Sequence, residues 1–309
     1  MDATVVDWLL DSDPAIRWQV SRDLVDAPTE VVAAERARVA TDGWGARLLA
    51  LQGPEGTWAG AGLFPEYTST CWSLMQLREF GLEPSADETR HAIALVREHG
   101  RWEHAGQPFF EGEVEPCING KVVAFGAYFG VDVTPIVDRL LGEQMEDGGW
   151  NCEQENGSTR GSFHSTIAVL EGLLEHERAT GGTSASLVAR LRGQDYLLER
   201  RLLRRKSTGE LIDPSFSQFS FPTFYFYDAL RGLDYLRDAG ARPDERVAEA
   251  VGLIESKRDT DGRWPLENDH PGKRHFPIDE GEGRPSRWNT LRALRVLRWV
   301  GQDDGLAIE

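Results

Sequence analysis

Residues 144–151 read Gln-Met-Glu-Asp-Gly-Gly-Trp-Asn, and this stretch decides the fold. An apolar run with helical spacing ends at Gln144, and glycines that follow such a run are typical of a helix end. The same order of helix, glycine and tryptophan occurs three more times, at 56–58, 100–102 and 261–264. A unit that returns at intervals of about 45 to 55 residues indicates a repeat protein.

Each glycine–tryptophan turn is followed by a polar loop and then by a second apolar segment with helical spacing. These second helices are predicted at 70–81, 119–130, 166–177 and 290–301. A further unit, at about 187–240, keeps both helices, the second at 226–240, but has no glycine–tryptophan turn. We therefore predict five helix pairs over 45–301, preceded by N-terminal helices over 1–44.

A single helix pair cannot bury its apolar face alone, so repeated pairs must pack against one another. The second helices carry the smaller and more apolar residues, which predicts that they form an inner ring covered by more charged outer helices. The expected fold is all-α: one domain over 1–309, built as an α/α toroid of repeated helix hairpins. Trp58, Trp150 and Trp264 are expected to pack against the neighbouring helix pair.

Composition limits the classes of partner. The chain has 34 Lys and Arg against 51 Asp and Glu, a net charge of −17. Such a surface repels phosphate backbones and anionic lipids, so we expect no nucleic-acid partner and no adsorption to membranes. No apolar run is long enough for a membrane span. The N-terminus lacks a signal-peptide pattern, and three cysteines are an odd number, so we expect a cytoplasmic protein with free thiols.

The repeat also predicts where chemistry lies, because equivalent positions of the inner helices should face one common opening. The reference positions are Thr70, Asn119, Thr166, Phe226 and Thr290. Two residues before them lie Thr68, Cys117, His164, Phe224 and Trp288. Cys117 and His164 belong to consecutive units, and Cys152 lies in the loop between them.

Two thiols and an imidazole are the ligands that zinc prefers, and three protein ligands leave a coordination position open. We therefore predict a zinc site at Cys117, Cys152 and His164, with Glu115, Glu153 and His104 as further candidate ligands. Two alternatives stay open. The cysteines can be small buried apolar residues and the histidine a helix cap, or the group can be a metal-free nucleophile or acid–base pair.

Aromatic residues gather before the fourth inner helix and at the start of the fifth. Phe221, Phe224, Tyr225 and Trp288 are predicted to line an apolar substrate pocket, or otherwise to be core packing. The basic run at 199–206 either binds a phosphate or is the charged end of an outer helix.

The repeat resembles that of the prenyltransferase and squalene-cyclase superfamily. Residues 144–151 are similar to its Gln–Trp motif, 51–58 match more loosely, and the resemblance covers about 45–300. It implies an α/α toroid like that of triterpene cyclases and of the β subunits of protein prenyltransferases. It also implies zinc ligands at the starts of inner helices, where 164–166 occupy the place of the ligand histidine. At 117–119 the order departs from the expected Asp-x-Cys, since Cys comes first and Asn third.

The acid motif of triterpene cyclases, Asp-x-Asp-Asp, is missing from the inner-helix sequences, so protonation of an alkene by that route is not expected. Our hypothesis is a zinc-dependent enzyme that acts on an apolar or prenyl-like small substrate. A carbohydrate-active α/α barrel with aromatic platforms, or a non-catalytic binding scaffold, are the alternatives.

Overall fold

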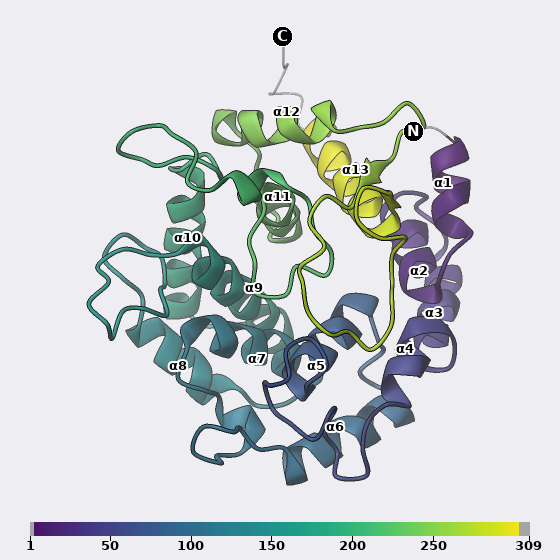
Figure 1. Cartoon of the computed structure of the whole chain (residues 1–309), viewed down its shortest axis with the longest axis vertical. Coiled ribbons are helices and arrows are strands. Elements are labelled where there is room, and N and C mark those ends of the chain that lie inside the picture. The colour runs from purple at the N-terminus through teal and green to yellow at the C-terminus, as the bar shows by residue number, and fades with distance from the viewer. Residues whose placement is uncertain (1–2, 303–309) are drawn as a thin grey trace. The chain divides into compact units, whose positions relative to one another are not determined.

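The computed structural model describes residues 3–302, and these are helical with one very short strand pair (Figure 1). The helices of the five predicted pairs are α4 (Gly43–Leu49) and α5 (Thr70–Phe80), α6 (Asp87–His99) and α7 (Pro116–Tyr128), α8 (Thr134–Gly142) and α9 (Phe163–Thr180), α10 (Ser184–Leu198) and α11 (Ala229–Asp238), and α12 (Ala248–Ser256) and α13 (Arg287–Gly301). They follow α1 (Ala3–Leu10), α2 (Pro14–Asp23) and α3 (Thr29–Ala37). Four short 3₁₀ helices are η1 (Arg38–Ala40), η2 (Phe109–Glu111), η3 (Pro214–Ser217) and η4 (Glu245–Val247). The prediction of repeated helix hairpins is confirmed.

The described residues group into two compact units. One contains residues 3–32, 194–271 and 277–302, and the other contains 33–193 and 272–276. We call them the terminal unit and the central unit. None of the described helices is both long and apolar enough to cross a lipid bilayer.

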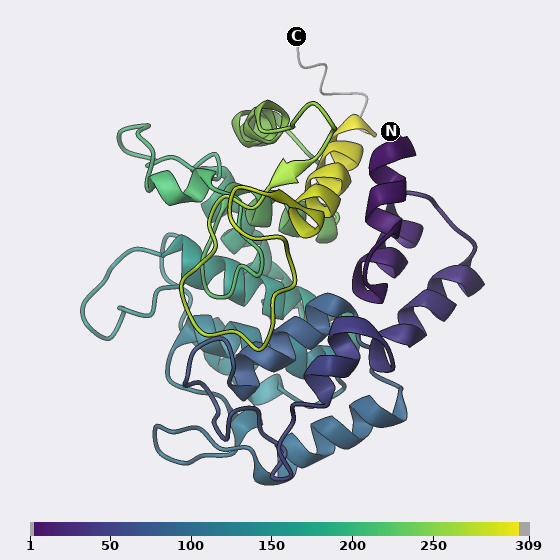
Figure 2. The ribbon, with the colours of Figure 1, turned by 45° about the vertical axis from the view of Figure 1, so that its right-hand side comes forward.

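In the central unit, α7 packs closely against α9, and α5 packs against both α4 and α7 (Figures 1 and 2). The close approach of α7 and α9 depends on glycine. A Cβ on Gly120 would lie 2.5 Å from the backbone carbonyl of Ala168, and Gly172 faces the Gly120 carbonyl. Two helices that carry glycine at the crossing point can bring their backbones together, because no side chain separates them.

The glycine–tryptophan turns have the same geometry in three hairpins. The indole nitrogens of Trp58, Trp150 and Trp264 each donate a 2.7 Å hydrogen bond to the carbonyl ten residues earlier. All three rings have no exposed area. Their backbone N–H groups donate to the hydroxyls of Thr70, Thr166 and Thr290. The threonines are three of the reference positions chosen from sequence, so the register of these units is confirmed.

Two of these turns also attach to the next outer helix. The Gln144 amide donates to the carbonyls of Gly148, in its own turn, and of Ala189, in α10. Gln52 makes the equivalent pair of bonds to Gly56 and to Ala92 in α6. Each of these two hairpins is therefore joined by its turn to the outer helix that follows it in the chain.

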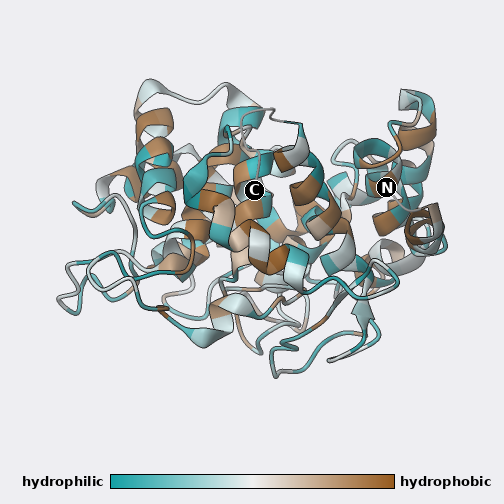
Figure 3. Cartoon of the chain, turned by 90° about the horizontal axis from the view of Figure 1, so that it is seen from above, coloured by the Kyte–Doolittle hydropathy of each residue, from teal (hydrophilic) through white to brown (hydrophobic). Residues whose placement is uncertain are grey.

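In the terminal unit, α13 packs against α2, α11 and α12, and α1 packs against α2. The strands β1 (Trp264–Pro265) and β2 (Pro285–Ser286) pair antiparallel before α13. Many helices carry apolar residues beside polar ones, as the amphipathic pattern predicts (Figure 3). Arg295 of α13 is buried and forms an ion pair with Asp23 of α2.

The fourth inner helix differs from its predicted bounds. It begins at Ala229, where the Asp228 carboxylate caps it by accepting from the Arg231 N–H. The predicted start at Phe226 is wrong because residues 219–228 form a loop. Tyr227 replaces the missing tryptophan, since its hydroxyl donates to the Leu202 carbonyl at 2.9 Å.

Candidate functional site

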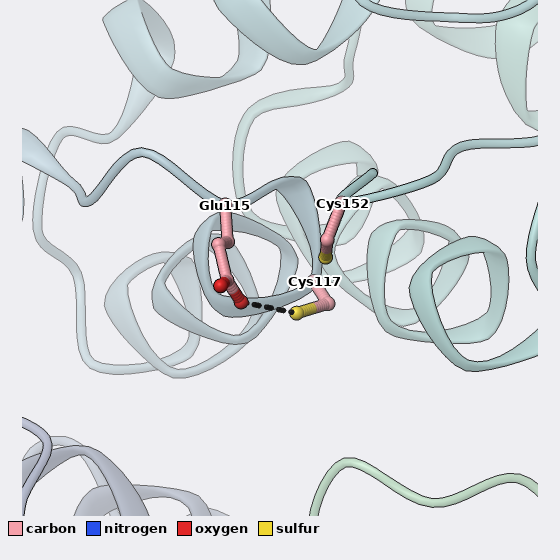
Figure 4. A group of neighbouring side chains, drawn as sticks. All are labelled: Glu115, Cys117 and Cys152. Carbon is pink, nitrogen blue, oxygen red and sulfur yellow. Dashed lines mark hydrogen bonds between the residues drawn. The ribbon is translucent and has the colours of Figure 1, made fainter. Parts of the chain in front are cut away.

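Three side chains from two segments of the central unit converge at the start of α7. Glu115 precedes this helix, Cys117 is its second residue, and Cys152 follows Trp150 in the loop that leads to α9 (Figure 4). Their ligand atoms all lie within 4.8 Å of one another. Glu115 is exposed, Cys117 is buried and Cys152 is partly buried, so the group lies at the boundary between core and solvent.

Local sequence explains why these segments hold the three side chains in place. Pro116 occupies the first turn of α7, where its fixed φ angle suits a helix start and Glu115 is the N-cap residue. The loop with Cys152 is fixed at its beginning by the buried Trp150. The Asn151 amide closes the loop by donating to Ser158 Oγ and to the Arg160 carbonyl. Both thiols therefore lie on restrained backbone.

The two thiols differ in acidity. Hydrogen bonding to Cys152, burial and the Glu115 carboxylate raise the pKa of Cys117. The same hydrogen bond from Cys117 lowers the pKa of Cys152 against the effect of burial, and Ser165 assists. Glu115 Oε2, 3.4 Å from Cys117 Sγ, is the alternative acceptor for the one proton of that thiol, and Cys152 Sγ lies 3.3 Å from Ser165 Oγ. Cys152 is thus the thiol that ionises first.

His164 is not a member of this group. It is the second residue of α9, and the next residue, Ser165, is the one that contacts Cys152. Successive helical residues point about 100° apart, so the register that selects position 164 does not also direct it at Cys152. Of the further ligands expected from sequence, Glu115 joins the thiols, whereas Glu153 and His104 are outside the group. The role of His164 as a ligand stays a prediction.

Ser165 is the contact that sequence reasoning missed. The sequence carries a signal for this contact. Thr166 accepts a hydrogen bond from the Trp150 backbone, and this bond brings the first turn of α9, where Ser165 lies, to the loop that holds Cys152. Cys71, the third cysteine, lies outside the group and is fully buried, and this burial raises the pKa of its thiol to about 12.

The four aromatic residues predicted to line a pocket all belong to the terminal unit. The rings of Phe221 and Trp288 stack at 4.2 Å between centroids, and both are buried. Phe224 is buried with a positive φ of 47°, and Tyr225 packs against Phe226 at 4.2 Å. Whether these rings bind a substrate stays a prediction.

The basic run at 199–206 is engaged in ion pairs with the chain's own acids. Arg204 pairs with Glu249 at 2.5 Å, and Lys206 pairs with Glu199 at 2.6 Å. These contacts argue against a phosphate site, and the run follows the end of α10 at Leu198 rather than forming part of the helix.

No protein-family model matches this chain, and no curated protein matches it either. Among solved structures, it is similar to a variant of the type II terpene cyclase MstE from Scytonema, solved with the substrate geranylgeranyl dihydroxybenzoate. The match has 17% sequence identity and a TM-score of 0.44, and covers 92% of this chain and 86% of the cyclase chain.

Proposed function

We propose that Glu115, Cys117 and Cys152 bind a zinc ion and that the chain is a zinc-dependent enzyme for an apolar or prenyl-like substrate. The observation that carries the proposal is the convergence of two sulfur atoms and one carboxylate oxygen within 4.8 Å. Thiolate and carboxylate donors fit zinc, and a three-ligand set is typical of catalytic rather than structural zinc.

The donors are chemically suited to a metal. When bound, zinc would lower the pKa of a thiol or a water molecule at its open position. A cysteine must lose its proton to bind a metal, so the affinity for the metal depends on pH. Cys152 is the thiol that ionises first, and Cys117, whose pKa is raised, must lose its proton to solvent when the metal binds.

The chain also supplies the contacts that would orient the ligand atoms. Ser165 Oγ, 3.3 Å from Cys152 Sγ, would fix the direction of that sulfur atom. Such outer contacts are typical of metal sites and tune affinity by about 10- to 100-fold. The apolar pocket proposed at Phe221, Phe224, Tyr225 and Trp288 lies within the terminal unit and is proposed independently of the zinc ligands.

Metal analysis tests the proposal. Purified protein is expected to contain about one zinc ion per chain, measured by inductively coupled plasma mass spectrometry. The variants Cys117→Ser and Cys152→Ser should each lose this zinc. Cys71→Ser is the matched control, because Cys71 is a buried thiol outside the group and its loss should leave the zinc content unchanged. Wild-type protein without stoichiometric zinc, or Cys117→Ser with full zinc content, would overturn the metal site.

Two further variants identify the remaining ligand. If Glu115 is the third zinc ligand, Glu115→Gln should weaken zinc binding and His164→Gln should not. The opposite result would assign the place to His164, as the sequence predicts. Thermal shifts with prenyl diphosphates and with simple sugars then test the substrate class, since a ligand at 100 times its Kd stabilises the native state by about 2.7 kcal/mol. Stabilisation by sugars alone would contradict a prenyl-like substrate.

A further inference from the structure

A five-residue segment of the long loop before α13, Gly272–Phe276, packs on the start of α5 in the central unit. Gly272 lies directly against the Tyr67 ring, where a Cβ would collide with the ring atoms. At its other end, the Arg47 guanidinium lies 4.1 Å from the centroid of the Phe276 ring. We call Gly272–Phe276 the covering segment.

The covering segment places a histidine against a buried serine. His275 Nε2 lies 3.0 Å from Ser73 Oγ, although 202 residues separate them in the chain. The Ser73 side chain, in the first turn of α5, has no exposed area. A serine hydroxyl within hydrogen-bond reach of an imidazole is the first requirement of a nucleophile–base pair.

The second requirement is a group that orients the base. The His275 ring also hydrogen-bonds the Thr68 backbone, and this bond raises the pKa of the imidazole, as expected when a carbonyl accepts from a ring N–H. With that N–H at Nδ1, Nε2 is left unprotonated and accepts the Ser73 hydroxyl.

The protonation states also suit nucleophilic chemistry. Burial lowers the pKa of His275 below its ordinary value, and Lys273 lowers it further, so the ring is neutral at pH 7. The other nucleophile on this turn of α5 is Cys71, and burial keeps its thiol protonated by raising its pKa to about 12. Ser73 is therefore the side chain on this turn with a base at hand.

Thr68 adds an unused donor. Its hydroxyl is buried, with the residue 4% exposed, and it has no hydrogen-bond partner among the described residues. A buried hydroxyl without a partner is unfavourable, and a ligand oxygen at this place would satisfy it. The Thr68 backbone holds His275, so Thr68 is a direct neighbour of the Ser73–His275 pair.

We propose that Ser73, His275 and Thr68 form a second catalytic site that hydrolyses small esters through an acyl-serine. Ser73 Oγ bonds to the ester carbonyl carbon while its proton passes to His275 Nε2. The Thr68 hydroxyl donates to the oxygen that becomes negative. The ester C–O bond breaks, and the leaving alcohol takes the proton from Nε2. Water then attacks the acyl-serine with His275 again as the base, and the carboxylic acid is released.

Size restricts the substrate. Neither Ser73 nor Thr68 has appreciable exposed surface, and the covering segment, which has no regular secondary structure, must move to admit a ligand. The site therefore suits a small acyl group such as acetyl. It involves none of the proposed zinc ligands, so the two proposals can fail separately.

The fluorophosphate diester diisopropyl fluorophosphate is the direct probe, because its phosphorus bonds to an activated serine with release of fluoride. Wild-type protein is expected to gain one adduct by intact-mass spectrometry, located at Ser73 by peptide sequencing. Ser73→Ala should gain none, and His275→Gln should react at least 100-fold more slowly, as expected for loss of a general base. Thr68→Val should slow the reaction about 10- to 100-fold, since one donor to the developing charge is lost.

Two controls test whether the reaction is confined to Ser73. Ser186→Ala removes another buried serine hydroxyl of the central unit and should react like wild type. Protein treated with a chelator to remove metal should also react like wild type, so a failed zinc site leaves this result intact. Release of p-nitrophenol from p-nitrophenyl acetate gives the second readout. Wild-type protein with no adduct at Ser73, or His275→Gln that reacts at the wild-type rate, would overturn the proposal even if the Ser73 variant does not fold.

Discussion

The crossing of α7 and α9 allows a sharp test, because Gly120 leaves no room for a side chain. In Gly120→Ala the new Cβ would lie 2.5 Å from the carbonyl carbon and oxygen of Ala168, whereas ordinary contact begins at 3.4 Å. The helices must therefore move apart by about 3.4 − 2.5 = 0.9 Å, since backbone atoms cannot rotate away. Overpacking of this kind costs about 1–3 kcal/mol, and the gain in helix propensity returns about 1 kcal/mol. We expect a net loss near the upper end, about 2 kcal/mol.

Thermal unfolding followed by circular dichroism measures this loss. A change of about 2 kcal/mol should lower the Tm by about 3 °C, because an unfolding entropy of about 2.1 cal/mol/K per residue amounts to about 0.65 kcal/mol/K for 309 residues. Gly142→Ala is the matched control, because Gly142 is also helical but its Cβ would meet no atom within 4 Å. This control should keep or slightly raise the Tm. If Gly120→Ala melts at or above the temperature of Gly142→Ala, the close backbone contact between α7 and α9 is refuted.

Buried polar contacts give three more predictions. Trp150→Phe should lower the free energy of unfolding by about 1–3 kcal/mol, because it leaves a buried carbonyl without its indole donor. Trp8→Phe, at a partly exposed ring, should lower it less. Equal shifts in Tm for the two variants would contradict the role of the hydrogen bond. Burial raises the pKa of Asp279 from 3.8 to about 6. Between these two values the folded state keeps a proton that the unfolded state has lost. The free energy of unfolding should therefore fall by about 3 kcal/mol as the pH rises from about 4 to 6. Asp279→Asn should flatten this slope in thermal melts, and an unchanged slope would exclude Asp279 as its source. Arg295→Met should lower the free energy of unfolding by about 3–5 kcal/mol, because it leaves Asp23 without its buried partner. Adding Asp23→Asn should recover part of this free energy. Losses that are strictly additive in urea unfolding would show that the two residues are not coupled.

The repeat was predictable because its signal is local. A glycine lies two residues before each of Trp58, Trp150 and Trp264, so register could be assigned from the sequence at Thr70, Thr166 and Thr290. The fourth unit lacks both features. Tyr227 performs the anchoring there through its hydroxyl, and a tyrosine in an aromatic-rich loop carries no distinguishing pattern.

The candidate site was predictable only in part. Cys117 and Cys152 could be paired because the repeat fixes the start of α7 and the loop after Trp150 against each other. The third member depends on the direction of side chains, and a register counted along the chain does not supply that direction. The contact between Ser73 and His275 could not be predicted, because it depends on the path of a long loop without repeat or periodicity.

The two glutamine bridges have a consequence for how such a chain can grow. The amides of Gln52 and Gln144 donate to backbone carbonyls, but Gln144 also accepts a hydrogen bond from the Arg192 guanidinium of α10. The donated bonds do not depend on which side chains the following helix carries, whereas the accepted bond does. A hairpin duplicated after the Gln52 turn could therefore dock without compensating substitutions at this bridge, whereas one duplicated after the Gln144 turn would keep the full set of bonds only with an arginine at the place of Arg192.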